Sequence, residues 1–141
     1  RGNNHRKSAL LDTESISTIN LRVGSGQRII TAEPGDNVIL TCRAAEKQDV
    51  IVVKWSRTDL DRNDLESDHY VLRYRDSQFD PEFQPLSFRN RVSLLDVKNG
   101  DVSLDLKNMT TTDRGTYECR SLRKEIIAGR DPLWTPSAIL T

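Results

Sequence analysis

The fold of this chain is decided by the stretch Asp113-Arg114-Gly115-Thr116-Tyr117-Glu118-Cys119. Its pattern, Asp-x-Gly-x-Tyr-x-Cys, places a tyrosine two positions before the second of the two cysteines in the chain. The first cysteine, Cys42, is followed thirteen positions later by Trp55. Each feature is weak alone, whereas the joint spacing is hard to obtain by chance. The alternative is a pair of unrelated thiols in a cytosolic protein.

Together, Cys42, Trp55 and Asp113-x-Gly115-x-Tyr117-x-Cys119 resemble the variable-type (V-set) immunoglobulin family over about residues 27–141. The long interval between the cysteines leaves room for the C′ and C″ strands that distinguish variable from constant types. The resemblance implies an all-β fold, an immunoglobulin V-type β-sandwich of two antiparallel sheets with Greek-key connections.

The same resemblance implies a disulfide between Cys42 on strand B and Cys119 on strand F, with Trp55 of strand C packed against the sulfurs. A disulfide implies an oxidising compartment. In the chain-entropy account, closing a loop of this length stabilises the fold by about 4–5 kcal/mol.

Three more residues take structural roles from the family pattern. Tyr117 is expected to form the tyrosine corner, with its ring buried and its hydroxyl bonded to the backbone just upstream. Arg91, at the start of strand D, is expected to pair with Asp113. This ion pair would close one end of the sandwich.

Composition limits the function classes. The chain has 141 residues, of which 35% are hydrophobic and 30% charged, with a formal net charge of +0, as expected for one soluble domain. Balanced charge argues against a general binder of nucleic acid or anionic membrane, because such binders need a basic surplus. No apolar run reaches the roughly 20 residues that span a bilayer, and the polar, basic start is no signal peptide. We therefore expect a fragment whose signal has been removed and whose membrane anchor lies outside this sequence.

The N-terminal region is predicted to be partly unstructured. Residues 1–15 hold few large apolar groups and are predicted to be a flexible leader, so the V-set domain comprises residues 16–141. Strand A is expected at 15–23 and its second segment at 27–31, with a glycine-rich kink between them. In V-set domains such a split strand switches between the sheets.

Alternation of apolar and polar residues predicts the remaining strands. A short C″ strand is expected after a turn at 76–79, and a hairpin turn at 98–101. The predicted strands are B at 37–42, C at 50–55, C′ at 70–75, D at 91–96, E at 102–106, F at 116–122 and G at about 134–141, with the F–G loop at 123–132.

No cofactor or metal is expected. Carboxylates gather after Trp55, which raises the possibility of calcium, but the spacing lacks the glycine and glutamate of an EF-hand loop. A solvated loop is the plainer explanation, and His69 is too isolated to be a metal ligand. Asn108-Met109-Thr110 is the one N-x-S/T sequon, so Asn108 is a predicted glycosylation site. The carboxylates are Asp59, Asp61, Asp64, Glu66, Asp68 and Asp76.

Enzyme activity is not expected either. The sequence has no Gly-rich phosphate loop, no G-x-S-x-G and no H-E-x-x-H. Its two histidines, His5 and His69, form no Ser/His/Asp set. A sandwich filled by its own side chains offers no concave, partly dry site.

Further stretches are similar to the V domains of butyrophilin-like and related costimulatory or adhesion receptors, especially those of fish. They are the turn Glu33-Pro34-Gly35-Asp36 and the runs 70–75 and 90–92. The resemblance implies an extracellular domain of a single-pass plasma-membrane protein, an immune regulatory receptor or ligand. Such a domain would bind a protein on another cell through strands G, F, C and C′ (the GFCC′ sheet) and the F–G loop.

That sheet supplies the candidate binding face. Val52 and Lys54 point outward on strand C, and outward valines are unusual on a surface that meets only water. Strands C′ and F add aromatic, aliphatic and charged groups, a mixture that suits an interface centre ringed by charge. A bulge in C′ would shift its outward residues by one. The predicted face is Val52, Lys54, Tyr70, Leu72, Tyr74, Glu118, Arg120 and Leu122.

Two alternatives stay open. The first is a junctional type of adhesion molecule that associates with itself through the same sheet. The second is a secreted or structural immunoglobulin module that acts as a spacer. Antibody-like pairing is disfavoured, because Leu133-Trp134-Thr135-Pro136 lacks the Phe/Trp-Gly-x-Gly of antigen-receptor joining segments.

Overall fold

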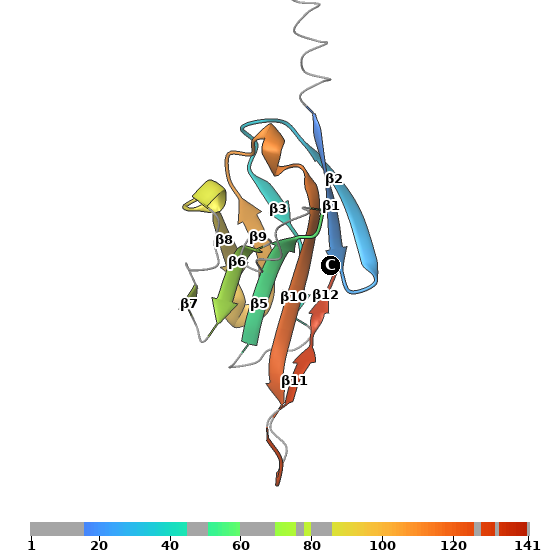
Figure 1. Cartoon of the computed structure of the whole chain (residues 1–141), viewed down its shortest axis with the longest axis vertical. Coiled ribbons are helices and arrows are strands. Elements are labelled where there is room, and N and C mark those ends of the chain that lie inside the picture. The colour runs from blue at the N-terminus through green and yellow to red at the C-terminus, as the bar shows by residue number, and fades with distance from the viewer. Residues whose placement is uncertain are drawn as a thin grey trace, which may run out of the picture.

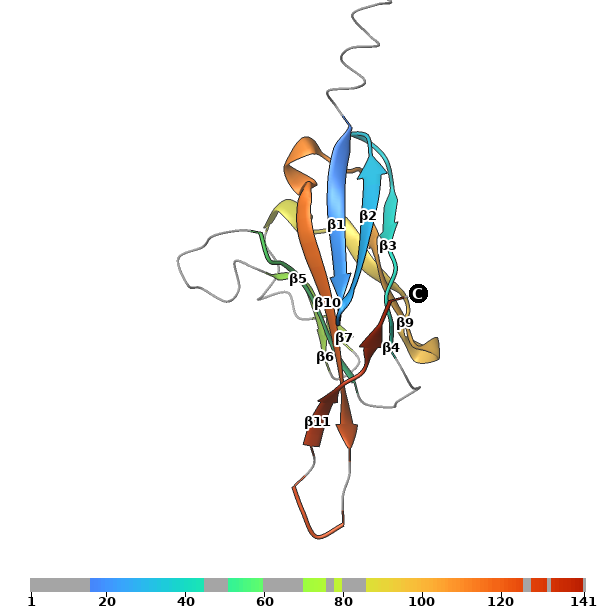
Figure 2. The same cartoon turned by 90° about the vertical axis from the view of Figure 1, so that its right-hand side faces the viewer.

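Two stacked β-sheets form this chain (Figures 1 and 2). The computed structural model describes residues 16–44, 51–59, 70–75, 78–79, 86–125, 128–131 and 133–140. Within these ranges the regular elements are strands and short 3₁₀ turns in two sheets, so the predicted all-β sandwich is confirmed. The expected leader at 1–15 and most of the carboxylate-rich insert lie outside the described residues.

The front sheet has the strand order β2-β1-β10-β5-β6-β7, and β11 also pairs with β10. Its pairs are antiparallel except for β1 with β10, which run parallel. The strands are β1 Ser17–Val23, β2 Gly26–Ala32, β5 Ile51–Arg57, β6 Tyr70–Arg75, β7 Gln78–Phe79, β10 Gly115–Glu125 and β11 Leu133–Pro136.

The back sheet has the order β12-β4-β9-β3, and β8 pairs with β9. Its strands are β3 Val38–Leu40, β4 Arg43–Ala44, β8 Val92–Asp96, β9 Asp101–Leu106 and β12 Ala138–Ile139. The 3₁₀ turns are η3 Leu86–Phe88, η4 Val97–Asn99 and η5 Thr111–Asp113.

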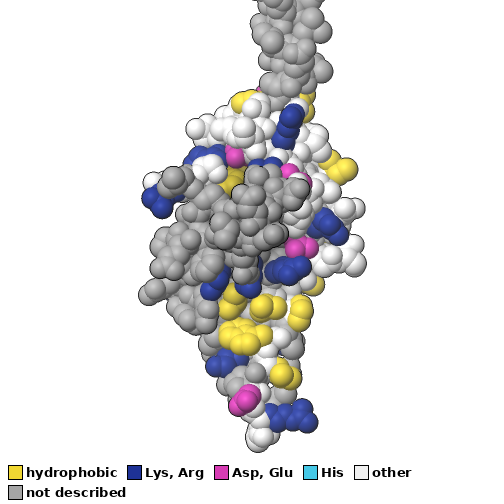
Figure 3. Space-filling view, viewed as in Figure 1, with side chains coloured by type: hydrophobic (Ala, Val, Ile, Leu, Met, Phe, Trp, Pro, Cys, Tyr) yellow, Lys and Arg dark blue, Asp and Glu magenta, His cyan; other side chains and the backbone are white. Residues whose placement is uncertain are grey.

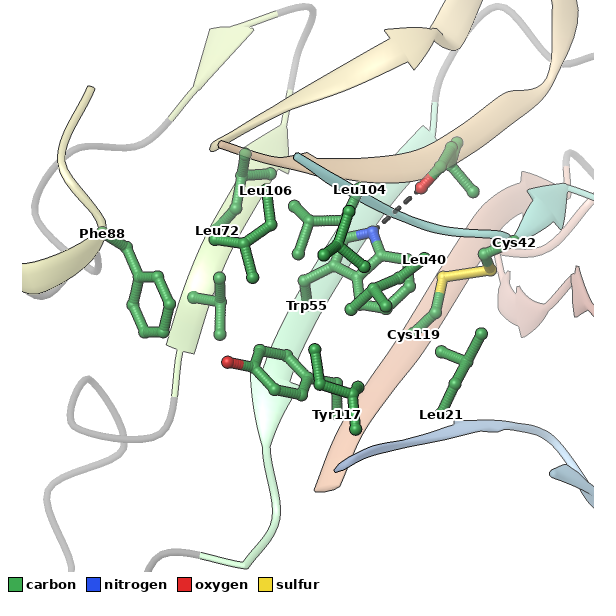
Figure 4. Close-up of a cluster of buried hydrophobic side chains, with 14 of the residues drawn as sticks. Leu21, Leu40, Cys42, Trp55, Leu72, Phe88, Leu104, Leu106, Tyr117 and Cys119 are labelled. Atoms are coloured by element: carbon green, nitrogen blue, oxygen red, sulfur yellow. Dashed lines mark hydrogen bonds between the residues drawn. A yellow bond between two sulfur atoms is a disulfide. The ribbon is translucent and has the colours of Figure 1, made fainter. Parts of the chain in front are cut away.

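The core lies between the sheets because alternate residues of each strand point inward. Cys42 and Cys119 are joined by a disulfide that connects the sheets, with 6.6 Å between their Cα atoms. Trp55 lies beside this bond (Figure 4), and its indole Nε1 donates to the carbonyl of Val102 at 2.9 Å. The Tyr117 hydroxyl donates to the carbonyl of Asp113. The predicted disulfide, tryptophan and tyrosine corner are confirmed.

The N-terminal strands differ from expectation. Ser17–Val23 and Gly26–Ala32 pair with each other as an antiparallel hairpin, so Gly24-Ser25 makes a turn rather than a kink. Both strands belong to the front sheet, and the expected switch between sheets was wrong. The reason is that Ile19 and Leu21 pair in parallel with Gly115 and Tyr117 of β10, which buries them completely.

Strand G also differs. Leu133–Pro136 pairs with β10 in the front sheet, whereas Ala138–Ile139 pairs with β4 in the back sheet. Pro136 has no N–H to continue a ladder, and the next residue, Ser137, bonds to the Ser121 carbonyl at 2.7 Å as the chain crosses over. Part of the predicted F–G loop is therefore strand, and the β10–β11 hairpin extends beyond the sandwich (Figure 2).

Candidate protein-binding face

The outward side of the front sheet is set by the register of β5 and β10. Trp55 and Cys119 pair on the inward side, so their neighbours Lys54 and Arg120 pair on the outward side. Leu122 lies beside Val52 in the same way. Of the predicted face, Lys54, Glu118, Arg120 and Leu122 therefore point outward as expected.

Two members of the predicted face on β6, Leu72 and Tyr74, point inward instead. A register shift between Trp55 and Ser56 leaves an extra residue in β6, since Trp55 pairs with Leu72 but Ser56 pairs with Tyr70. Beyond this bulge the alternation is inverted. Leu72 is only 2% exposed and lies in the core, and Tyr74 packs against the core beside Val53.

The predictions that Leu72 and Tyr74 face a partner were wrong. Arg73, opposite Lys54, takes the outward position instead. The backbone of Tyr70 pairs with Ser56 on the outward side, but its side chain lies outside the described part of the structure.

Val52 needs a smaller correction. It lies on the outward side opposite Leu122 on β10, but only 8% of it is exposed. Cross-strand neighbours this close cover one another's side chains. Val52 therefore forms the floor of the face, and Leu122 is the more accessible aliphatic group.

Two outward residues of β11 were missed by the sequence analysis. Trp134 lies opposite Lys124 and is 43% exposed, and Pro136 lies opposite Leu122. They extend the apolar row of Val52 and Leu122 toward the tip of the hairpin. The signal was present as β-compatible residues after the loop, but Pro136 favoured an irregular edge over a paired strand. Figure 3 shows the apolar patch in the open, over β10 and β11, with basic groups on either side. We call Val52, Leu122, Trp134 and Pro136 the apolar strip.

Basic side chains flank the apolar strip. Arg22 on β1 lies opposite Glu118, Lys54 lies opposite Arg120, and Lys124 lies opposite Trp134. Glu118 is the one acidic residue among the described outward positions of the front sheet, and its Oε1 accepts from Arg120 Nε at 2.9 Å. The face is therefore positive although the whole chain has a formal net charge of +0.

A hollow of about 370 Å³ opens beside the strip, where β1 ends and β11 leaves β10. One part of its lining is apolar, from Leu122 and Pro136, and another is charged, from Lys54, Glu118 and Arg120. The hollow lies at the edge of β10 opposite β5. On that edge β1 pairs with β10 only as far as Cys119, and β11 pairs with it only from Leu122 onward.

The opposite end of β10 is held by an ion pair. Arg57 bonds to Asp59 at 3.0 Å and lies over the ring of Tyr117, 5.5 Å from its centroid. Asp59 also accepts the Thr116 N–H at 2.9 Å. Burial alone would raise the pKa of Asp59, but Arg57 and Thr116 outweigh it and hold the pKa below its ordinary value. The sequence analysis did not find the Arg57–Asp59 pair.

The described residues do not support a calcium site. Asp59 is committed to Arg57, and the other five carboxylates lie outside the described ranges. Where side chains are described, no group of three or more His, Cys, Asp or Glu could hold a metal ion.

The sequon lies away from the face. Asn108 follows β9 of the back sheet and is exposed. Its φ of 53° is the left-handed conformation that asparagine tolerates well. Its backbone N–H is held by the Asn37 side chain at 3.0 Å. The predicted glycan remains a prediction.

The family model for the immunoglobulin V-set domain matches residues 25–132. This chain belongs to the immunoglobulin V-set family. The match begins after β1, although β1 is part of the core of this V-set domain. The chain is not an enzyme, because its family and relatives are non-enzymatic receptors and adhesion or immune-regulatory proteins.

Curated relatives of this V-set domain are larger proteins. It is 31% identical to the Coxsackievirus and adenovirus receptor homolog of Danio rerio over 114 residues, 79% of this chain and 30% of the relative. It is 28% identical to V-set and immunoglobulin domain-containing protein 8 of Mus musculus over 144 residues, 98% of this chain and 34% of the relative. The chain thus spans about a third of the length of these relatives.

Solved structures agree on the fold. The human B7-H4 IgV-like domain has a TM-score of 0.51 at 22% identity, covering 86% of this chain and 90% of that one. Bovine butyrophilin has a TM-score of 0.53 at 18% identity, covering 89% and 52%. The V-set domain is thus related to cell-surface receptors and ligands, whose V-set domains are typically extracellular. Within the described ranges, no helix is long and apolar enough to cross a membrane.

Proposed function

We propose that this V-set domain is the recognition module of a cell-surface immune regulatory receptor or ligand. It binds a protein on another cell through the outward side of the front sheet, formed by β11, β10, β5 and β6, and through the β10–β11 hairpin. The domain lies outside the cell, in the ectodomain of a protein with a single membrane anchor.

The observation that carries this proposal is the apolar strip. Leu122 lies between Val52 and Pro136, and Trp134 extends the row along the hairpin. An apolar row on an exposed sheet is unfavourable in water unless a partner covers it. Aromatic and aliphatic groups surrounded by charge are the usual composition of a protein interface.

The relatives support the proposal at the level of their names. One is called a receptor homolog, and one structure of similar fold is a complex of ICOS with ICOS-L. The latter has 20% identity and a TM-score of 0.51, so it supports the fold and makes recognition through such a fold reasonable.

Substitution of Leu122 tests the proposal. Fluorescent tetramers of the domain are applied to a panel of leukocyte and epithelial cells, and a Leu122→Asp tetramer is compared with an Ile39→Asp tetramer. Ile39 is an exposed aliphatic residue on the back sheet, so the control matches the chemistry of the change. We expect Leu122→Asp to abolish staining and Ile39→Asp to preserve it, while both variants keep their melting temperature within a few degrees.

The alternatives give different results. Self-association through the front sheet would appear in sedimentation velocity as a dimer whose fraction rises with protein concentration. The Leu122→Asp variant would not form this dimer. A spacer would stain no cell and remain a monomer. Either result would overturn the proposal of a different protein as partner.

A further inference from the structure

The β10–β11 hairpin presents a tryptophan where the fold does not need one. The hairpin extends beyond the sandwich (Figures 1 and 2), and its last pairs join Lys124 to Trp134 and Glu125 to Leu133. Trp134 points to the front and is 43% exposed, outside the buried core. Tryptophan is one of the residues enriched at the energetic centres of interfaces, which lie in well-packed pockets.

The hollow beside the strip has a different chemistry. Lys54 and Arg120 form its charged side, and Leu122 and Pro136 form its apolar side. Its one acidic lining residue, Glu118, already accepts from Arg120. That bond uses Nε, and 69% of the Arg120 side chain is exposed. The hollow of about 370 Å³ therefore combines a basic wall with an apolar one, which suits the aliphatic stem and carboxylate of a glutamate or aspartate.

From these two features we infer that the partner presents an acidic protein surface with an apolar pocket. Resting on the proposed function, this inference adds that Trp134 enters the pocket and that a partner carboxylate enters the hollow between Lys54 and Arg120. Arg22 and Lys124 face further acidic groups at the rim.

The same charges disfavour a second copy of this domain. If two front sheets met face to face, basic side chains at the outward positions of β1, β5 and β10 would oppose one another, with Glu118 as the one acidic group described there. Like charges across an interface oppose association and suppress wrong partners. A sulfated polysaccharide would satisfy the charges, but it would leave Trp134 and Leu122 without apolar contacts.

The experiment compares charge reversal on the two sheets. Lys54→Glu with Arg120→Glu changes the front sheet. Arg43→Glu with Lys98→Glu makes the same change in net charge at exposed positions of β4 in the back sheet and of the turn η4 between β8 and β9. Trp134→Ala is compared with Leu95→Ala, an exposed aliphatic residue on the back sheet. Tetramers of each variant are titrated onto the staining cells at about 50 mM and about 300 mM salt, with and without heparinase treatment.

We expect the front-sheet reversal and Trp134→Ala each to weaken binding by about 30-fold or more, as for interface hot spots. Both back-sheet controls are expected to bind within about twofold of the wild type. Wild-type binding is expected to fall at high salt, because attraction between exposed charges is screened.

Other results would overturn the inference, and each also shows whether the proposed function still holds. If Leu122→Asp abolishes binding but charge reversal and salt leave it unchanged, the proposed function stands and the acidic partner is rejected. Binding that Trp134→Ala does not weaken rejects the anchor. Loss of staining after heparinase identifies a polysaccharide ligand and rejects both. An absence of staining on every cell rejects both as well.

Discussion

Arg91 and Asp113 form a two-bond ion pair, with 2.9 Å between Nη1 and Oδ2 and 3.0 Å between Nη2 and Oδ1. The same guanidinium donates to the carbonyls of Ser87, Lys107 and Asn108, and Asp113 also accepts the Thr110 N–H at 2.9 Å. One ion pair thus connects the turn before β8, the end of β9 and the turn before β10. A bidentate arginine–carboxylate bond fixes all three segments more rigidly than a single contact does.

Removing the carboxylate charge of Asp113 tests this connection. Burial alone would raise the pKa of Asp113, but Arg91 and the Thr110 N–H outweigh it and hold the pKa below its ordinary value. Ionised Asp113 therefore stabilises the fold above about pH 4, and this stability is lost as the pH falls through the lowered pKa. We expect Asp113→Asn to reduce the free energy of unfolding by about 3 kcal/mol at pH 7, because the half-buried Arg91 guanidinium loses the carboxylate that compensates its charge.

Urea unfolding between pH 7 and pH 2.5 checks this prediction. The loss of stability below about pH 4 should be smaller in Asp113→Asn than in the wild type. It should not vanish, because the pKa of Asp59 is also lowered. Asp131→Asn, in an exposed loop, serves as the control. If the two variants had the same profile, the ion pair would not exist in solution.

Gly115 is predicted to be irreplaceable for two reasons. Its φ is 147°, which side-chain-bearing residues rarely adopt, and a Cβ there would lie 2.5 Å from Asp59 Oδ2 and 2.6 Å from Arg57 Nη2. Gly129, with φ at 78° and open space around it, carries the backbone penalty alone. We expect Gly129→Ala to lose about 1 kcal/mol of stability and Gly115→Ala to lose about 2–3 kcal/mol in urea unfolding, because the Arg57–Asp59 pair must also shift. Equal losses would mean that the Arg57–Asp59 pair does not press on Gly115.

Strand β1 is predicted to be indispensable although it lies outside the V-set match at 25–132. Leu21 on β1 is completely buried beside Tyr117, whereas Ile29 on the neighbouring β2 is 71% exposed. We expect Leu21→Ala to reduce the free energy of unfolding by about 3 kcal/mol and Ile29→Ala to change it by less than about 0.5 kcal/mol. Thermal unfolding by circular dichroism measures both. A harmless Leu21→Ala would show that β1 does not pack beside β10.

Asn108 is predicted to carry a glycan when the domain passes through a eukaryotic secretory pathway. Mass spectrometry before and after enzymatic removal of N-glycans detects it. Asn108→Asp is the suitable variant, because aspartate also tolerates the φ of 53° at this position. The variant should lose the glycan and keep its stability within about 1 kcal/mol. An unmodified wild type would contradict the prediction.

Much of the core could be predicted because its residue types and their spacing in the sequence are characteristic of the fold. The positions of Cys42, Trp55, Tyr117 and Cys119 define two sheets joined by a disulfide, and each residue is buried where the pattern implies. Alternation in β9 and β10 was equally informative, because each strand has one buried face.

The candidate face was harder to predict, because the direction of its side chains depends on backbone geometry that the sequence pattern does not reveal. One bulge opposite Trp55 turned Leu72 and Tyr74 inward, and a single added residue reverses every later position of a strand. Trp134 was missed because the pairing of β11 depends on how far β10 extends beyond the sandwich. The length of a strand is set by tertiary contacts, which the periodicity of the sequence does not reveal.

The central claim, recognition through the front sheet, is tested most directly by a glycan placed on that sheet. Lys54→Asn creates a sequon at 54–56 on the front sheet, and Ile39→Asn creates one at 39–41 on the back sheet. Lys54→Gln removes the same charge without adding a sequon. Mass spectrometry confirms that both introduced sites carry glycan, and tetramer staining of cells measures binding. The account predicts that Lys54→Asn abolishes staining, that Lys54→Gln weakens it only a few-fold and that Ile39→Asn leaves it intact. Full staining by the glycosylated Lys54→Asn tetramer would contradict the account.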